Sequence, residues 1–231
     1  MSDDDHAREV AKERGYDVLA PIDEAFERGE LTQDQWHARV MAVVEPAYLG
    51  ATTEQMGSGH SGTQATWDAS RGLVMEAVDG PGTFLDVGCA NGLLMESVGR
   101  WSRERGHAVE PYGVEISPRL AELARRRYPK WRNRIWAANA DGWHPPMRFL
   151  FVRTGLEYVP ARRREAFVRH LVDNVVEPGG RLIFGKNNEN RGESDIARSL
   201  RSWGWTGVQE VRRPHVHPDV EMSVVWLDAP R

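Results

Sequence analysis

The sequence predicts an α/β fold in which a helical N-terminal segment precedes a mostly parallel, seven-stranded sheet. Two observations carry this prediction. From Thr83 onward, short apolar runs alternate with stretches of helical periodicity, which is the pattern of a parallel sheet with helices on its faces. Within residues 13–50, the apolar residues instead recur at helical spacing. With 231 residues, the chain is long enough to bury the core that such a sheet requires.

A helix is predicted within residues 13–50. Thr32 and Gln35 form a capping box, in which each side chain accepts a hydrogen bond from the backbone N–H of the other residue. Trp36 begins the apolar face that follows at helical spacing. We expect Pro46 to end this helix, because proline has no backbone N–H to donate.

The remaining elements are predicted in chain order. A Gly- and Ser-rich loop covers residues 51–62, and Thr63 caps a helix that ends at the Gly-Pro-Gly of residues 80–82. The strands are predicted at 83–87, 112–116, 134–138, 149–152, 182–185, 206–211 and 222–227. The helices between them are predicted at 93–105, from the Ser117-Pro118 cap onward, around 167–175 and near 194–203. Residues 224–227 are apolar without alternation, so we expect the last strand to be buried on both faces.

Composition and charge narrow the class of protein. The 34 acidic residues outnumber the 30 basic ones, which argues against a nucleic-acid partner, since such proteins usually carry a basic surface. The single cysteine, Cys89, excludes an intrachain disulfide framework and any multi-cysteine zinc site. No apolar run is longer than residues 40–44, and the acidic N-terminus is unlike a signal peptide. We therefore expect a cytoplasmic protein with no membrane partner.

The arginine runs and the histidines are not expected to form binding sites. The arginine runs 125–127 and 162–164 are expected to be solvated helix faces rather than phosphate contacts, because the protein as a whole is acidic. The histidines are too scattered for a metal site, and His215 with His217 lacks a third ligand nearby. No metal is therefore expected.

The chemistry starts where the first predicted strand ends. Residues 84–92 read Phe-Leu-Asp-Val-Gly-Cys-Ala-Asn-Gly, so a buried strand leads through an acid into a turn of small residues that opens a helix. Small residues let the backbone approach a ligand, and free N–H groups at a helix start can face its polar end. An ordinary tight turn is the simpler interpretation. A dinucleotide fingerprint fits poorly, because its third glycine would fall on the bulky Leu93 and Asp86 is foreign to it.

The pattern Asp86-x-Gly88-x-Ala90-x-Gly92 resembles motif I of the class I S-adenosylmethionine-dependent methyltransferases, and the overall character resembles the actinobacterial small-molecule type. The resemblance covers roughly residues 60–228 and implies a Rossmann-like sheet whose last strand is antiparallel. It implies that Glu115, at the end of strand two, holds both ribose hydroxyls of the cofactor. After strand three, Asn139 and Asp141 compete for the adenine amino group. The implied cofactor contacts are Asp86, Gly88, Cys89, Ala90, Gly92, Glu115, Ile116, Asn139, Ala140, Asp141 and Arg153.

In this family the methyl acceptor lies above the end of strand four, which here reads Arg-Thr-Gly-Leu-Glu-Tyr over residues 153–158. Thr154 and Tyr158 are the substrate contacts that the resemblance implies. The Asn/Asp-Pro-Pro-Tyr/Phe tetrad of many nucleic-acid and protein methyltransferases is absent there. A small molecule with a hydroxyl or amine is the expected acceptor.

Two residues are candidates for the general base. His60 lies in a glycine-flanked loop before the helix that leads into motif I, and the unperturbed pKa of histidine suits a base at neutral pH. Glu157 lies at the end of strand four, where the acceptor is expected, although burial would have to raise its pKa. Alignment without a base is the alternative.

The chain is expected to divide into an N-terminal tail and helical lid, residues 1–62, and a catalytic domain, residues 63–231. The apolar face of the lid needs a partner, so we expect it to cover the active site, and it could also pair two subunits as a homodimer. A non-catalytic S-adenosylmethionine-binding regulator or scaffold, a nicotinamide oxidoreductase and a methyltransferase of macromolecules are the alternative functions.

Overall fold

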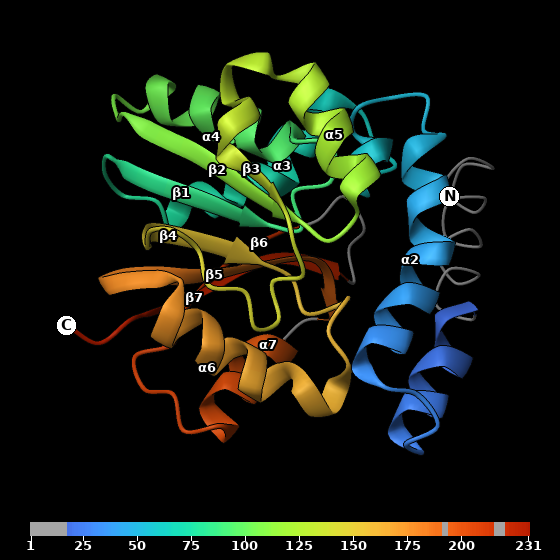
Figure 1. The fold of residues 1–231 in the computed structure, drawn as a ribbon. Coiled ribbons are helices and arrows are strands. Elements are labelled where there is room, and N and C mark those ends of the chain that lie inside the picture. Colours follow the sequence, from blue (N-terminus) through green and yellow to red (C-terminus); the bar gives the residue numbers. More distant parts are fainter. Residues whose placement is uncertain (1–17, 191–193, 215–219) are drawn as a thin grey trace.

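The computed structural model describes residues 18–190, 194–214 and 220–231 and shows one seven-stranded sheet (Figure 1). The strand order is β3-β2-β1-β4-β5-β7-β6, and β7 runs antiparallel to both of its neighbours. The strands are β1 Gly82–Val87, β2 Val109–Glu115, β3 Ile135–Ala137, β4 Phe149–Thr154, β5 Val176–Asn190, β6 Gln209–Pro214 and β7 Val220–Asp228. The predicted fold class, including the antiparallel last strand, is confirmed.

The strand order reverses between β1 and β4. From β1 the chain moves outward to β2 and β3, and it then returns to place β4 on the other side of β1. In open α/β sheets a crevice forms at the carboxyl ends of the strands where the order reverses, and ligands collect there. The carboxyl end of β1 carries the turn of small residues that the sequence singled out.

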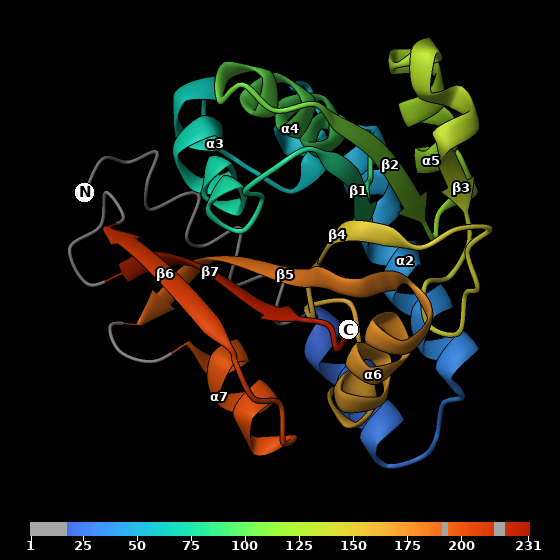
Figure 2. The same cartoon turned by 90° about the vertical axis from the view of Figure 1, so that its left-hand side faces the viewer.

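Helices cover both faces of the sheet (Figure 2). The strands alternate their side chains between the faces. Phe84 and Phe151 pack with the cluster of α3 (Gln64–Arg71) and α4 (Leu93–Glu104), whereas Leu85 and Val152 pack with that of α6 (Arg164–Asn174) and α7 (Asp195–Ser202). All four side chains are almost fully buried, which is typical of strands with helices on both sides. The helix between β2 and β3 is α5 Pro118–Arg127. Within the described residues there are also four short 3-10 helices: η1 Met56–Ser58, η2 Gly72–Glu76, η3 Pro129–Arg134 and η4 Ala161–Arg163.

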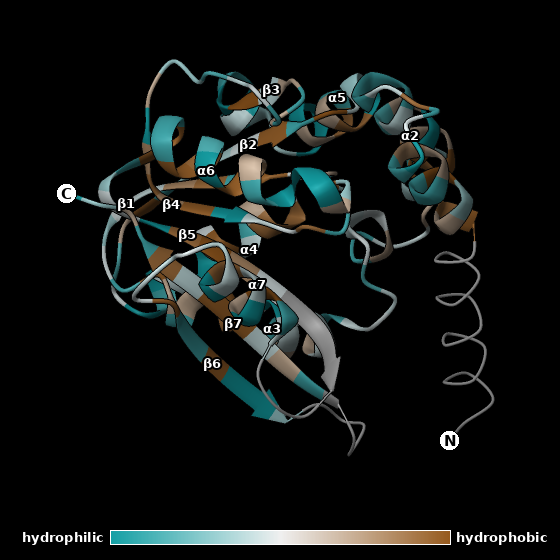
Figure 3. Cartoon of the chain, turned by 90° about the horizontal axis from the view of Figure 1, so that it is seen from below, coloured by the Kyte–Doolittle hydropathy of each residue, from teal (hydrophilic) through white to brown (hydrophobic). Residues whose placement is uncertain are grey.

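The helix starts follow the predicted cap chemistry. Thr63 accepts a hydrogen bond from the N–H of Thr66, and Ser117 accepts one from the N–H of Leu120 with Pro118 at the first helical position. The last strand is also as predicted, since residues 224–227 are buried on both faces. The edge strand β6 that flanks it is largely hydrophilic (Figure 3), which limits pairing with other chains.

The N-terminal helices form a small cluster of their own. A helix covers residues 18–27, and α2 follows at Gln33–Leu49 with the predicted capping box of Thr32 and Gln35. Their buried apolar residues are Ala25, Phe26, Leu31, Trp36 and Val40. Figure 1 shows α2 standing across the ends of the strands toward which the arrows of β1, β2 and β4 point.

The prediction that Pro46 ends this helix is wrong. Pro46 lies inside α2, which continues to Leu49. Near the end of a helix, the missing N–H and the crowding of the preceding turn affect only one hydrogen bond. The last turn is held in place by contacts with the rest of the protein, because Glu45 and Tyr48 both reach residues beyond the strand ends. Within the described ranges, no helix is both long enough and apolar enough to cross a bilayer.

Candidate active site

The turn after β1 has the backbone geometry of a ligand cradle. Gly88 and Gly92 have φ angles of +79° and +82°, in the left-handed region that favours glycine. A Cβ added at Gly88 would meet nothing within 4 Å, so the space above this backbone is open. Ala90 adopts φ +47°, which is uncommon for a residue with a side chain. This turn therefore exposes a strained backbone to an open space at the reversal point of the sheet.

Glu115, the last residue of β2, lies beside this turn and is 4% exposed. One carboxylate oxygen accepts from the N–H of Ala90 at 2.8 Å, and the other accepts from the N–H of Ser117 at 2.9 Å. Burial raises the pKa of Glu115, and the two backbone donors oppose that rise by favouring the ionised form. Each oxygen keeps acceptor capacity for a hydroxyl of a ligand.

Asp86 and Arg153 face each other across the reversal point, since they are register partners in β1 and β4. Nη1 of Arg153 lies 3.4 Å from Oδ1 of Asp86. Burial raises the pKa of Asp86 to about 7, although the charge of Arg153 acts in the opposite direction. A buried carboxyl whose pKa lies near 7 beside a charged partner is typical of functional sites.

Arg71, the last residue of α3, was missed in the sequence and belongs to the same cluster. Burial, followed by the charge of Arg153, lowers its pKa to about 10, whereas Glu157, Tyr48 and Asp86 act to raise it. Arg71 and Arg153 line the same small cavity.

Asn91 was also missed, although it is fully buried. Its side-chain oxygen accepts from the N–H of Leu93 at 3.1 Å and from the hydroxyl of Ser58, and its amide donates to the carbonyl of Glu54 at 2.8 Å. It thereby ties the loop before α3 to the turn after β1. The sequence signal for this role is the position of Asn91 just before the predicted helix start, because asparagine side chains often accept from the first N–H groups of a helix.

The helix α2 contacts the residues that follow β3. Nδ1 of His37 lies 3.2 Å from the side-chain nitrogen of Asn139, and Gln33 donates to the carboxylate of Asp141. Arg163 also donates to Asp141, at 3.1 Å.

The same helix reaches the ends of two more strands. Glu45 accepts from the hydroxyl of Ser117, directly after β2, and pairs with Arg119 at 2.9 Å. The hydroxyl of Tyr48 lies 3.3 Å from that of Tyr158, beyond β4. We call Gln33, His37, Glu45 and Tyr48 the latch residues of α2, because together they tie this helix to the ends of three strands.

Comparison with known proteins gives no matching family model. A curated relative, N-(5'-phosphoribosyl)anthranilate isomerase of Haloferax volcanii, is 36% identical over 128 residues. That alignment covers 49% of this chain, and the chain spans 53% of the length of that protein. Half of each protein is thus outside the match.

Solved structures match more of the chain. The N-methyltransferase NodS from Bradyrhizobium japonicum WM9 has a TM-score of 0.56 at 17% identity, with 72% of this chain and 97% of that one covered. The 1,6-didemethyltoxoflavin-N1-methyltransferase of Burkholderia thailandensis, with S-adenosylhomocysteine bound, has a TM-score of 0.53 at 17% identity, with 73% and 80% covered.

The chain has the class I S-adenosylmethionine-dependent methyltransferase fold. At these identities the likeness concerns the fold alone. The [4+2]-cyclase SpnF is similar to the same extent, with a TM-score of 0.55 at 15% identity over 82% of this chain and 92% of that one. The fold therefore does not by itself determine the reaction.

The residues of this methyltransferase fold suit S-adenosylmethionine. The open space above Gly88 admits a ligand close to the backbone, and the carboxylate of Glu115 is oriented by two donors while retaining acceptor capacity. At the end of β3, however, the polar groups of Asn139 and Asp141 are bonded to α2. If they bind adenine, these bonds must be exchanged when the cofactor enters.

Three of the other predicted cofactor residues, Cys89, Ile116 and Ala140, follow β1, β2 and β3 respectively. The thiol of Cys89 packs into the core of α4 and α5, and burial raises its pKa. Ile116 and Ala140 are half-buried beside Glu115 and Asn139 along the chain.

The predicted substrate contacts are divided between the interior and the surface. Thr154 is buried and donates to the carbonyl of Gly155 at 3.1 Å, whereas Tyr158 is 45% exposed next to Tyr48.

The two candidate bases occupy different places. Nε2 of His60 lies 3.0 Å from the hydroxyl of Thr66, and its ring meets the edge of Trp67 with 5.7 Å between centroids. This places His60 at the start of α3. Glu157 is exposed and lies at the end of β4, where its charge acts on Arg71.

The expectation that residues 162–164 form a solvated face holds only in part, since Arg162 is exposed whereas Arg163 and Arg164 are half-buried. Arg163 binds Asp141, Arg164 donates to the carbonyl of Val159, and Arg162 lies 3.8 Å from the ring centroid of Phe26. Their charge is used in contacts within the protein, because the fold brings the start of α6 against the N-terminal helices.

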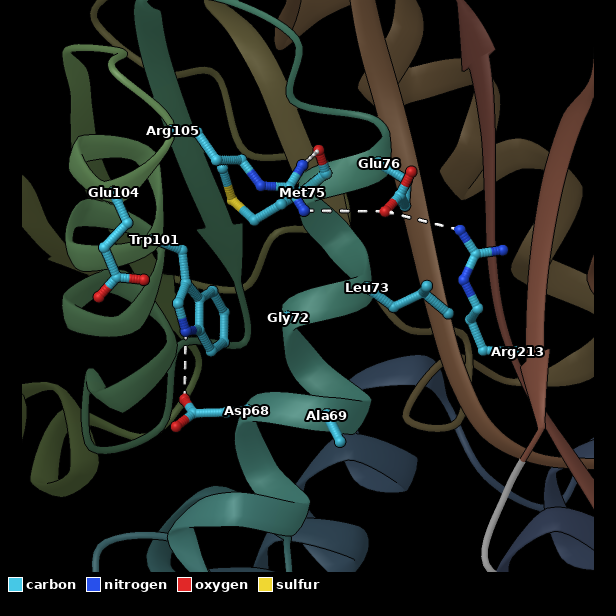
Figure 4. Close-up of a pocket in the computed structure, with 10 residues that line it drawn as sticks. All are labelled: Asp68, Ala69, Gly72, Leu73, Met75, Glu76, Trp101, Glu104, Arg105 and Arg213. Carbon is cyan, nitrogen blue, oxygen red and sulfur yellow. Dashed lines mark hydrogen bonds and ion pairs between the residues drawn. The ribbon is translucent and has the colours of Figure 1, made fainter.

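A separate cavity of about 400 Å³ lies between η2 and α4 (Figure 4). Its charged groups are paired: Glu76 lies between Arg105 and Arg213, and Asp68 and Glu104 both pair with Arg100 beside the cavity. Over residues 18–190, 194–214 and 220–231, no three His, Cys, Asp or Glu side chains are grouped as metal ligands. His215 and His217 lie outside the described residues.

Proposed function

We propose that this protein transfers a methyl group from S-adenosylmethionine to a hydroxyl or amine of a small molecule. The observation that carries the proposal is the pairing of the open turn at Gly88 with the oriented carboxylate of Glu115, at the reversal point of a methyltransferase sheet. Similar folds named as N-methyltransferases, one of a toxoflavin precursor, support a small-molecule acceptor.

The chain would hold the cofactor by groups of matching chemistry. Glu115 accepts from the two ribose hydroxyls, and Asp86 accepts from the amino group of the methionine part. Asn139 and Asp141 read the adenine after the latch bonds are exchanged. When bound, S-adenosylmethionine supplies an electrophilic methyl carbon for an in-line displacement.

The protein itself must align the acceptor with the methyl group, exclude water and remove a proton from the nucleophile. The helix α2 lies over the strand ends and would shield the reacting groups from water, which is the role proposed for the segment 1–62. Thr154 and Tyr158 would align the acceptor. His60, or Glu157 as the alternative, would accept the proton that the nucleophile loses.

Calorimetry with the purified protein tests the cofactor. S-adenosylhomocysteine and S-adenosylmethionine should bind, and NAD should not. NAD binding without binding of either sulfur compound would overturn the proposal in favour of an oxidoreductase.

Transfer itself is tested with S-adenosylmethionine that carries a trideuterated methyl group. The protein is incubated with the small-molecule and the macromolecular fractions of a cell extract, and the label is followed by mass spectrometry. We expect label in the small-molecule fraction. Label in macromolecules alone would assign a macromolecular substrate, and binding without transfer in either fraction would assign a regulator or scaffold. The isomerase name belongs to a relative of which half is unmatched, and no residue of this site favours it.

The remaining proposals concern partners and location. We propose a cytoplasmic protein that binds neither nucleic acid nor membranes, in keeping with its net charge of −4. The N-terminal helices could pair two subunits. Sedimentation at several protein concentrations would detect such a homodimer.

A further inference from the structure

Two arginine side chains are brought together at the strand end where the acceptor is proposed to bind. Arg153 is part of β4, Arg71 ends α3, and both line one small cavity together with Ser70 and Ser223. The charge of each guanidinium acts on the other, which is unfavourable in a partly buried place. Natural proteins keep such unfavourable arrangements mainly at functional sites.

Arg71 has no partner that would explain its position. Within the described part of the chain, its guanidinium makes no hydrogen bond and no ion pair, and it lies 5.6 Å from the ring centroid of Trp67. The neighbouring Arg153 forms an ion pair with Asp86 at 3.4 Å. An arginine with five unused donors is suited to a planar or tetrahedral oxyanion.

Two carboxylates act on Arg71 without pairing with it. Against burial, which lowers the pKa of Arg71, the charges of Glu157 and Asp86 act to raise it, and Asp86 forms its ion pair with Arg153. In the described part of the chain the donors of Arg71 are therefore left for an oxyanion that a ligand brings.

The geometry points to Arg71 and Arg153 as a binding site for a carboxylate or phosphate group of the methyl acceptor. The inference rests on the proposed function, because it places the acceptor beside the cofactor. The inference narrows the methyl acceptor to an anionic small molecule. Its carboxylate or phosphate would bind the two guanidinium groups, and its hydroxyl or amine would face the methyl group of the cofactor. The carboxylate of the cofactor is the competing source of the same chemistry.

Thermal unfolding with inorganic phosphate or benzoate as the probe tests this site in the full chain, at saturating S-adenosylhomocysteine. Sodium chloride at matched ionic strength corrects for screening. We expect either anion at about ten times its Kd to raise Tm by about 3 °C. Arg71→Gln should lose this rise and Arg71→Lys should keep part of it. Arg126→Gln, which removes the same charge from an exposed position of α5, should keep all of it.

Two further measurements keep the test decisive. The Kd of S-adenosylhomocysteine for Arg71→Gln should stay within about threefold of the wild-type value, and a loss of about tenfold or more would assign the guanidinium to the cofactor and overturn the inference. Unliganded Arg71→Gln should melt within about 3 °C of the wild type, since the relieved repulsion from Arg153 offsets the lost contact with the ring of Trp67 and the lost attraction to Glu157 and Asp86. A larger fall in Tm would make Arg71 a structural residue and would overturn the inference as well.

The inference and the proposed function fail in different ways. If the wild type binds S-adenosylhomocysteine and neither anion, only the inference is overturned. If the wild type does not bind S-adenosylhomocysteine, the proposed function fails. The phosphate titration without cofactor then decides the anion site by the same comparison of Arg71→Gln with Arg126→Gln.

Discussion

The side-chain nitrogen of Asn139 lies 3.2 Å from Nδ1 of His37, so the residue proposed to read adenine is held by the N-terminal helix α2. A neutral imidazole can accept this hydrogen bond at Nδ1, whereas a protonated one cannot. Burial lowers the pKa of His37, which favours the neutral ring. In the described structure α2 is therefore held against the residues after β3, and the neutral state of His37 contributes to this contact.

The first prediction concerns the pH dependence of this latch. Because the pKa of His37 is lower in the folded protein than its ordinary value of 6.5, the unfolded chain takes up the proton first as the pH falls. The contribution of His37 to stability is therefore present at pH 7 and is lost as the pH falls through 6.5 toward the folded pKa. Urea unfolding at pH 7.5, 6.5 and 5.5 should show a steeper loss of stability for the wild type than for His37→Gln. Equal slopes would contradict the role of this histidine.

The second prediction concerns Glu115. Glu115→Ala should weaken the binding of S-adenosylhomocysteine by roughly 1–3 kcal/mol, the cost of removing a buried hydrogen-bonding partner. Calorimetry measures the loss. Glu110→Ala is the matched control, because Glu110 lies in the same strand but is exposed and pairs with Arg134 at the surface. Unchanged affinity in Glu115→Ala would mean that the ribose is held elsewhere.

The third prediction concerns Asp86, whose pKa burial raises to about 7. If its carboxylate accepts from the cofactor's amino group, binding must ionise it and release a proton. The affinity for S-adenosylhomocysteine should then rise with pH up to about 7 and level off above it. Calorimetry at pH 6 in two buffers of different ionisation enthalpy would count the released proton. Asp86→Asn should bind more weakly at pH 8 and show no proton release.

The fourth prediction concerns the lid. A truncation that begins at Ala51 removes α2 and its latch residues but keeps Glu54 and Ser58 on Asn91 and keeps the Thr63 cap of α3. We expect this protein to bind S-adenosylhomocysteine and to lose turnover, because water is no longer excluded from the strand ends. Full activity of the truncated protein would show that the N-terminal helices have no part in catalysis.

The fifth prediction concerns the general base. His60→Ala should lower kcat by about 10²-fold or more with the Kd of the cofactor unchanged, which is the size expected for lost acid–base help. His107→Ala is the control, since His107 precedes β2 and so lies at the amino ends of the strands, away from the turn after β1. Near-normal turnover of His60→Ala with a large loss in Glu157→Gln would assign the role to Glu157 instead.

Much of the fold could be predicted because its signals are local. The capping box of Thr32 and Gln35, the Ser117 cap and the apolar run of the last strand depend on residues close together in the chain. The same holds for the turn between Gly88 and Gly92, whose small residues permit the positive φ angles that the structure shows. Even the position of Glu115 follows from the strand pattern.

The contacts between distant segments could not be predicted, because they depend on how the strands assemble into the sheet. His37 meets Asn139, and Arg71 shares a cavity with Arg153, because the sheet order brings the strand ends together under α2 and beside α3. Pro46 inside α2 shows the same principle, since tertiary contacts outweigh a local helix-ending preference. Local signals in the sequence thus predict the strands, the helix caps and the turn after β1. The latch and the paired arginines depend on long-range packing, which no local periodicity encodes.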